Sequence, residues 1–171
     1  MSVLARSVTD MYETRLTRHL DASRSAIYRA LTDPEALARW RVPDNMTSEV
    51  HEFEAREGGA FRISLTYTSP GDTSPGDKGK SSEHTDTYHG RFLRLVPDEM
   101  VVEVFEFETS DPALYGEMKL TTTLVDAPGG GTRVTIHHEG VPDAVPPADN
   151  ELGQRMALDH LAKLVEKPAR R

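Results

Sequence analysis

The sequence predicts an α+β fold, in which a curved antiparallel sheet of about seven strands surrounds a long C-terminal helix. Three observations predict this fold. Short segments of alternating apolar and polar residues follow one another, and turns rich in glycine, proline and aspartate separate them, as in β-hairpins. Two short helical patterns come directly after the first of these segments. A longer helical pattern, over residues 148–167, closes the chain and can cover one face of such a sheet.

The final helix is predicted from its two ends and from its apolar residues. Asp149 or Asn150 is available to cap its first turn. Pro168 ends it, because proline cannot donate a backbone hydrogen bond and disfavours helix in the residue before it. Apolar residues at helical spacing form one broad face: Leu152, Met156, Ala157, Leu161, Leu164 and Val165.

Two residues interrupt this apolar face. Gly153 costs about 1 kcal/mol relative to alanine inside a helix, which suggests a close backbone approach to the sheet or to a bound molecule. His160 lies one turn from Met156 and from Leu164, so its imidazole should point to the interior edge of the helix. Two interpretations of His160 stay open: a core histidine satisfied by one hydrogen bond, or a polar group that lines a pocket.

The first strand is predicted over residues 14–20, where leucines alternate with polar residues. Two short helices follow within residues 21–40. Asp21 or Ser23 can cap the first helix, and Pro34 suits the first turn of the second helix.

The later strands are predicted from alternation, with residues 41–50 as a loop before them. The clearest alternation is in residues 61–67. In residues 100–109 the alternation slips, because Val104 falls in one phase and Phe105 in the other; either both strand faces are partly buried or a bulge interrupts the strand. The predicted strands cover residues 51–55, 61–67, 85–96, 100–109, 116–126 and 132–139.

The whole chain, residues 1–171, is predicted to form one domain with its core in residues 14–167. Residues 68–84 contain the sequence TSPGD twice in tandem, and such a density of proline, glycine and serine cannot build a core. We therefore predict a flexible hairpin loop there, either a tolerated insertion or a lid. Residues 168–171 are expected to fray.

Composition excludes several classes of function. The 171 residues are 37% hydrophobic and 28% charged, as in an ordinary globular protein. A formal net charge of −8 disfavours nucleic acid and anionic membrane as partners, since both require clustered lysine and arginine. The N-terminus lacks the apolar stretch of a secretory signal, so we expect a cytoplasmic location. The chain has no cysteine, which excludes disulfides, zinc–thiolate sites and cysteine nucleophiles.

A ligand cavity is predicted between the sheet and the final helix, because side chains cannot fill the whole concavity of a curved sheet. An apolar wall is expected from Trp40, Phe53, Phe61, Ile63, Tyr67, Phe105, Phe107 and Met118. Further candidates for ligand binding are Tyr88, Arg91, His138, Gly153, Met156 and His160. Most of the apolar candidates would serve equally as core. We expect Arg91 to face solvent; if it points inward, it would anchor a carboxylate or phenolate.

No metal site, cofactor or catalytic residue is predicted. His137 and His138 are adjacent on a strand and therefore point to opposite faces. One of them, with His89 and His160, could converge from three elements, but no two histidines have the i, i+3 or i, i+4 spacing of helical metal sites. The glycines at 129–131 stand between two strands, so they form a turn and not a phosphate-binding loop.

The chain also resembles a known family. Residues 21–40, DASRSAIYRALTDPEALARW, closely resemble the opening of the START/Bet v 1-like superfamily, in the branch named after the activator of Hsp90 ATPase homologue. Further segments match that pattern in order: residues 58–61, 88–93, 96–101 and 131–136. The resemblance covers residues 14–165 and implies the helix-grip fold, in which a curved antiparallel sheet holds a long helix.

The resemblance implies several functions, since the superfamily includes lipid and hormone carriers, aromatase/cyclases, self-sacrificing resistance proteins and a chaperone activator. We favour the binding of a small, mostly apolar molecule, aromatic or lipid-like, with His160 as an orienting group. Two alternatives stay open: cofactor-free cyclase or dehydratase chemistry in the same cavity, and docking onto a chaperone or another protein. The sequence is equally consistent with a monomer and with a homodimer.

Overall fold

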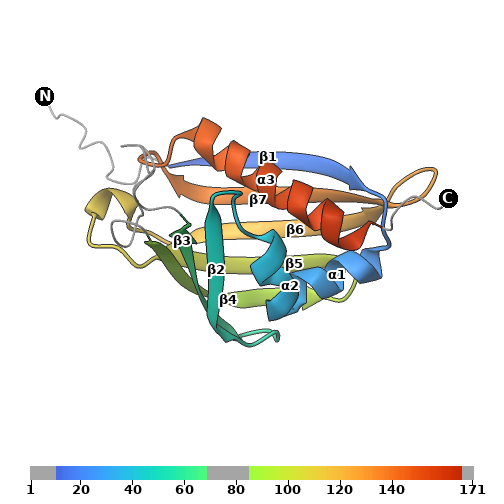
Figure 1. Cartoon of the computed structure of the whole chain (residues 1–171), viewed down its shortest axis with the longest axis horizontal. Coiled ribbons are helices and arrows are strands. Elements are labelled where there is room, and N and C mark those ends of the chain that lie inside the picture. The colour runs from blue at the N-terminus through green and yellow to red at the C-terminus, as the bar shows by residue number, and fades with distance from the viewer. Residues whose placement is uncertain (1–10, 69–84, 167–171) are drawn as a thin grey trace, which may run out of the picture.

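The computed structural model describes residues 11–68 and 85–166 (Figure 1). The predicted loop at 68–84, apart from Thr68, and the predicted frayed tail at 168–171 lie outside the described residues. The elements are β1 (Met11–Leu20), α1 (Arg24–Thr32), α2 (Pro34–Trp40), β2 (Met46–Phe53), β3 (Ala60–Tyr67), β4 (Thr85–Val96), β5 (Met100–Phe107), the 3₁₀ turn η3 (Pro112–Leu114), β6 (Met118–Asp126), β7 (Thr132–Pro142) and α3 (Pro147–Val165).

The seven strands form one antiparallel sheet in the order β1-β7-β6-β5-β4-β3-β2. The first strand therefore pairs with the last, and α1 and α2 carry the chain from one edge of the sheet to the other. All three α-helices lie on the same face of the sheet, where α3 contacts β1, α1 and α2 (Figure 1). The predicted curved seven-stranded sheet around a C-terminal helix is confirmed.

The two short helices begin at the residues that the sequence marks. The backbone N–H of Ala26 donates to Ser23 Oγ at 3.1 Å, so Ser23 is the cap of α1. The N–H of Glu35 donates to Asp33 Oδ1 at 3.0 Å, and Pro34 occupies the first turn of α2. These local hydrogen bonds satisfy the first backbone donors of each helix.

Strand β2 differs from its prediction, because it begins at Met46 and not at residue 51. Residues Met46 to Val50 pair with the C-terminal half of β3, with Met46 opposite Tyr67 and Val50 opposite Ile63. Threonine, serine and glutamate in this stretch give a weak apolar pattern, so pairing with a complete neighbouring strand, and not the local sequence, decides the conformation.

Strand β5 is buried on both faces, which is the first of the two predicted alternatives. Val101, Val102, Glu103 and Val104 are all buried. The register of β5 with β6 is continuous, and the irregularity beside β5 lies in β4, between Phe92 and Arg94.

Helix α3 presents a different face to the sheet from the predicted one. Its buried residues are Leu158, Leu161 and Ala162, whereas Leu152 and Leu164 are 52% and 37% exposed. The contact face is therefore rotated from the predicted face, because α3 packs against β1 on one side and against α1 and α2 on the other. The predicted side-chain cap is also wrong: Pro146 is at the N-cap, and no described side chain caps the helix.

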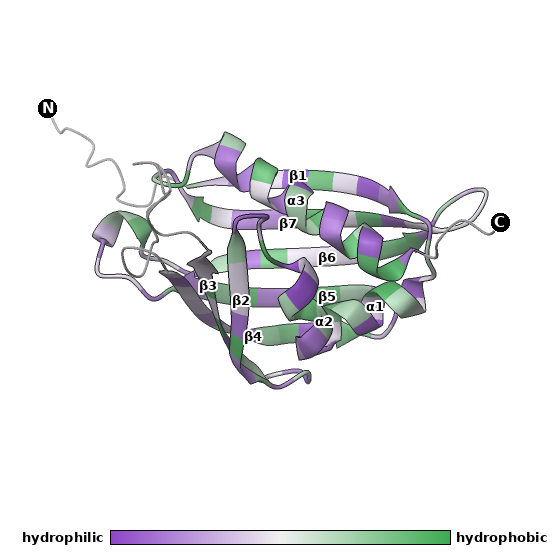
Figure 2. Ribbon diagram, in the orientation of Figure 1, coloured by the Kyte–Doolittle hydropathy of each residue, from purple (hydrophilic) through white to green (hydrophobic). Residues whose placement is uncertain are grey.

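The hydrophobic core lies between the concave face of the sheet and the helices. Buried and more exposed residues alternate along β6 and β7, as expected for strands with one inward face, and hydrophobic and hydrophilic residues are interspersed along the sheet (Figure 2). The largest fully buried side chains are Trp40, Phe61, Phe92, Leu20, Ile27, Ile63, Met118, Leu158, Leu161, Val101, Val134 and Val141.

Gly90 is the glycine that this packing requires most clearly. A Cβ atom at Gly90 would lie 2.0 Å from the Val104 carbonyl oxygen and 2.7 Å from the Phe105 Cα on the neighbouring strand.

We expect Gly90→Ala to lower the free energy of unfolding by about 1–3 kcal/mol, because backbone atoms of β5 must shift. Gly153→Ala is the control, since its Cβ meets no atom within 4 Å. It should be neutral or stabilise by up to about 1 kcal/mol. Urea unfolding of both variants checks this, and equal stabilities would contradict it.

Candidate functional site

A cavity of about 460 Å³ lies between α3, the segment after α2 and the concave face of β3 to β7. Most of its wall consists of aromatic and aliphatic side chains, and its polar groups come from the end of α2, from β4 and β7 and from the first turns of α3. The lining residues are Trp40, Arg41, Val42, Pro43, Asn45, Met46, Leu65, Tyr67, Asp86, Tyr88, Phe105, Phe107, Leu120, Ile136, His138, Val145, Asp149, Asn150, Leu152, Gly153, Gln154, Met156 and Ala157.

The structure brings eight of the predicted site residues together in this wall. They are Trp40, Tyr67, Tyr88, Phe105, Phe107, His138, Gly153 and Met156. Four predicted apolar residues instead pack in the interior. Phe61 and Ile63 are 1% exposed within the main core, Phe53 packs edge-on against Phe92, and Met118 is 1% exposed outside the cavity lining.

Arg91 does not reach the cavity. Gly90 and Phe92, on either side of Arg91 in β4, lie on the inner face of the sheet. Successive side chains of a strand point to opposite faces, so Arg91 lies on the outer face. There it is 51% exposed and forms an ion pair with Glu117 at 3.1 Å. Arg91 therefore faces solvent, and the condition for its role as an inward anchor is not met.

His160 also lies outside the cavity lining. Its Nε2 is hydrogen-bonded to the Asp44 carboxylate, in the segment between α2 and β2, and its Nδ1 is buried without a partner among the described residues. The rotation of α3 moves His160 away from the cavity, so that it ties α3 to this segment. Of the two interpretations, the structure is closer to the first: His160 has one side-chain hydrogen bond and lies outside the cavity lining, but it is only half-buried.

Gly153 lines the cavity but does not approach the sheet closely, because a Cβ at this position would meet no atom within 4 Å. The predicted close approach to the sheet is therefore wrong. The glycine leaves open space on the cavity side of α3.

His138 is the histidine of the cavity. Its side chain points inward from β7 and is 7% exposed, and its ring stacks on Phe105 with 5.6 Å between the ring centroids. The side-chain amide nitrogens of Asn150 and Gln154 each lie 3.2 Å from His138 Nδ1. Burial lowers the pKa of His138 to about 4, although the hydrogen bond from Asn150 opposes this shift. His138 is therefore neutral at physiological pH.

A buried ion pair forms the other polar part of the wall. The Arg41 guanidinium donates two hydrogen bonds to the Glu103 carboxylate, at 2.8 and 3.0 Å, and Glu103 is 2% exposed. Arg41 also lies over the Trp40 ring, 5.1 Å from its centroid. Burial alone would lower the pKa of Arg41, but the charge and hydrogen bonds of Glu103 outweigh it and hold the pKa above its ordinary value.

Tyr88 completes this polar group, because its side chain is hydrogen-bonded to Arg41. Burial raises the pKa of Tyr88 to about 12, so the phenol keeps its proton. Sequence analysis did not predict Arg41, Glu103, Asn150 or Gln154 as site residues. Two features of the sequence could have indicated the buried ion pair: one glutamate lies within the apolar run VVEVF, and one arginine directly follows the only tryptophan.

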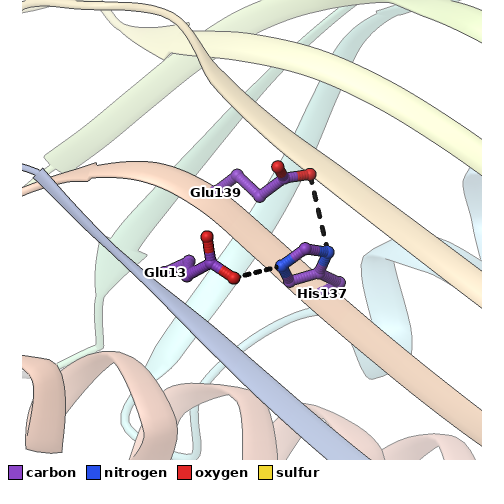
Figure 3. A group of neighbouring side chains, drawn as sticks. All are labelled: Glu13, His137 and Glu139. Carbon is purple, nitrogen blue, oxygen red and sulfur yellow. Dashed lines mark hydrogen bonds and ion pairs between the residues drawn. The ribbon is translucent and has the colours of Figure 1, made fainter.

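His89, His138 and His160, which the sequence suggested could converge, lie apart in the described structure. His89 lies on the outer face of β4, 3.2 Å from Glu106 and 3.0 Å from Glu108, while His138 points inward. Within residues 11–68 and 85–166, Glu13, His137 and Glu139 offer ligand atoms within 4.8 Å of one another. Figure 3 shows that the two carboxylates face different nitrogens of the His137 ring, at 2.8 and 3.5 Å. The His137 ring therefore lies between the two carboxylates, and each carboxylate contacts a different ring nitrogen.

A second depression, of about 580 Å³, lies at the surface near the start of α1. Its wall contains Asp21, Arg24, Asp98 and Asp126, and Arg24 already pairs with Asp126 at 3.0 Å. It has no aromatic side chain in its lining, so the cavity beside α3 is the better ligand site. Each described helix is too short or too polar to cross a membrane.

Replacement of His138 tests its neutral state. Between pH 6.5 and about 4 the unfolded chain binds a proton at this position and the folded protein does not, so stability falls as the pH is lowered. From pH 7 to about pH 5 this histidine should account for a loss of about 2 kcal/mol in the free energy of unfolding. His138→Gln should lack that part of the pH dependence in urea unfolding. The same slope in both proteins would refute a neutral buried His138.

Replacement of Glu103 tests the buried ion pair. Glu103→Gln leaves the Arg41 charge without its counter-ion and should cost about 3–5 kcal/mol of stability. The double variant Arg41→Met, Glu103→Leu removes both charges and should lose much less. Glu117→Gln, at the exposed pair with Arg91, is the control and should cost less than about 1 kcal/mol. Losses at Arg41 and Glu103 that simply add in a double-mutant cycle would contradict the coupling.

Comparisons with known proteins agree with this architecture. A crystal structure from Chromobacterium violaceum is 34% identical in sequence and has a TM-score of 0.77; the match covers 92% of this chain and 99% of that chain. A Mycobacterium smegmatis protein, at 15% identity and a TM-score of 0.72, covers 95% of both chains. An AHSA1-like protein from Aeromonas hydrophila has 16% identity and a TM-score of 0.65; this match covers 94% of this chain and 100% of that chain. The last two show the fold alone.

The search of curated proteins gives no match. The family model described as activator of Hsp90 ATPase homolog 1-like protein matches residues 21–166, which is most of the chain. The predicted resemblance is confirmed, and the chain belongs to the family of activator of Hsp90 ATPase homolog 1-like proteins.

Proposed function

We propose that this protein binds a small, mostly apolar molecule in the cavity between the sheet and α3. The observation that carries the proposal is the cavity itself: about 460 Å³ of space whose wall is largely aromatic and aliphatic. This volume is within the range of small-molecule sites, which are commonly apolar with a few placed polar groups. A ligand that buries about 200 Å² of apolar surface would gain about 5 kcal/mol from that burial.

The ionisation of the cavity residues supports binding over acid–base catalysis. The pKa of His138 is lowered to about 4 and the pKa of Tyr88 is raised to about 12, so neither group exchanges protons readily near neutral pH. His160, which was predicted as an orienting group in the cavity, is hydrogen-bonded to Asp44 outside the cavity lining. Cyclase or dehydratase chemistry therefore has less support than binding.

The open cavity also supports ligand binding over a purely protein-docking role. A domain that acts only by docking onto a chaperone has no need of internal space, and side chains would be expected to close it. Here the cavity stays open, and Leu152 at its edge is 52% exposed. An apolar side chain at the rim suits the entry of an apolar ligand.

Trp40 offers a direct test, because it is the only tryptophan and it lines the cavity. Its indole N–H donates to the Ala30 carbonyl at 2.8 Å, so it should give one well-resolved amide-region NMR signal. Titration with apolar aromatic compounds should shift this signal and raise the melting temperature. Gly153→Phe should fill the cavity and abolish both effects.

Lys163→Phe is the matched control, since Lys163 is exposed on the same helix away from the cavity lining. This variant should bind as the parent protein does. A panel of apolar compounds that leaves the Trp40 signal unchanged, or that binds equally well to Gly153→Phe, would refute the proposed function.

A further inference from the structure

Two buried polar atoms in the cavity wall lack hydrogen-bond partners. These are His138 Nε2 and Gln154 Oε1, and neither has a partner among the described residues. His138 is 7% exposed, yet only its Nδ1 has hydrogen-bond partners among the described residues. A buried polar group without a partner costs folding free energy, so its presence in a cavity wall points to a partner that arrives with a ligand.

The hydrogen bonds around His138 fix which nitrogen carries the proton. The Thr14 hydroxyl donates to Asn150 Oδ1 at 3.1 Å, which turns the Asn150 amide nitrogen toward His138 Nδ1. An amide nitrogen is a donor, so Nδ1 must accept, and Gln154 presents its amide nitrogen to the same atom. The proton of the neutral ring therefore lies on Nε2, and this N–H is a buried donor without a partner among the described residues.

The charges nearby restrict what can accept this hydrogen bond. Arg41 lies in the same wall and its charge acts on His138, so a cationic ligand would meet repulsion there. The Arg41 charge is already balanced by Glu103 through two hydrogen bonds. An anionic ligand would therefore bring an unbalanced charge into a site of low polarity. An uncharged acceptor avoids both costs.

We infer that the cavity selects an uncharged, mostly aromatic molecule with a hydrogen-bond-accepting oxygen, such as a carbonyl, that accepts from His138 Nε2–H. This inference rests on the proposed function and adds the chemical class of the ligand. The apolar part of the ligand packs against the aromatic wall, beside Phe105 and Trp40. The oxygen sits at the Nε2 edge of the imidazole and supplies the partner that the folded protein lacks, after a local adjustment of the side chains that cover this atom.

A matched series of naphthalene derivatives tests this selectivity by calorimetry on the full chain. The series consists of 2-acetylnaphthalene, 2-ethylnaphthalene, 2-naphthoate and the cation 2-naphthylmethylammonium. The ketone and the ethyl compound have nearly the same shape, so their difference isolates the acceptor oxygen. We expect the ketone to bind about 10-fold more tightly than the ethyl compound, as one net hydrogen bond would give. Both ions should bind more weakly than the ketone.

The variant His138→Phe should reduce the preference for the ketone over the ethyl compound to about 1-fold. A separate readout does not depend on this variant folding: a long-range ¹H–¹⁵N spectrum of the unmodified protein should show the His138 proton on Nε2. A proton on Nδ1 would overturn the inference.

The outcomes separate the inference from the function on which it rests. Equal binding of the ketone and the ethyl compound would overturn the inference and leave the proposed function standing. Failure of all four compounds to bind would overturn both.

Discussion

The pairing of the first strand with the last is the constraint on which the rest of this structure depends. Because β1 lies beside β7, the chain must cross from one edge of the sheet to the other before β2 can form. Helices α1 and α2 make that crossing on the concave face. Helix α3 follows β7 directly and must lie along β1, on the same face. The three helices therefore close one end of the concavity and leave space near the other, where the cavity lies.

Polar groups inside this apolar space are stable only because the sheet and helices supply partners for them. Glu103 points inward from a strand that is buried on both faces, and Arg41 at the end of α2 reaches it with two hydrogen bonds. Asn150 and Gln154 from α3 satisfy one nitrogen of His138 on β7. Each pair joins a helix to the sheet, so the same interactions hold the layers together and define the polar part of the cavity. The other nitrogen of His138 has no partner among the described residues, and it is the atom at which we propose that a ligand is held.

Membership in the activator of Hsp90 ATPase homolog 1-like family leaves a choice between ligand binding and chaperone regulation. The local chemistry favours the first. The aromatic wall supplies apolar contact area, and the Arg41–Glu103 pair has no net charge. Neutral His138 and neutral Tyr88 provide hydrogen bonds and not proton transfer near neutral pH. Such a site is suited to hold an uncharged molecule in one orientation.

The sequence by itself determined the order of strands and helices, because alternation, helical spacing and proline and glycine punctuation are local signals. Ser23 and Asp33 cap their helices through bonds that span only two or three residues. It also identified most of the aromatic wall, since large apolar residues on inward strand positions have few other places to go.

Only the tertiary structure decided the rotation of α3, the partner of each buried polar group and the start of β2. Apolar residues cover more than one side of α3, so packing against β1 and against α1 and α2 chose the inward face and took His160 out of the cavity. Arg41 and Glu103 stand far apart in the chain, and local patterning carries no information on such pairs. These features depend on contacts between elements that are far apart in the chain, and the energies of such contacts are set only when the helices pack on the sheet.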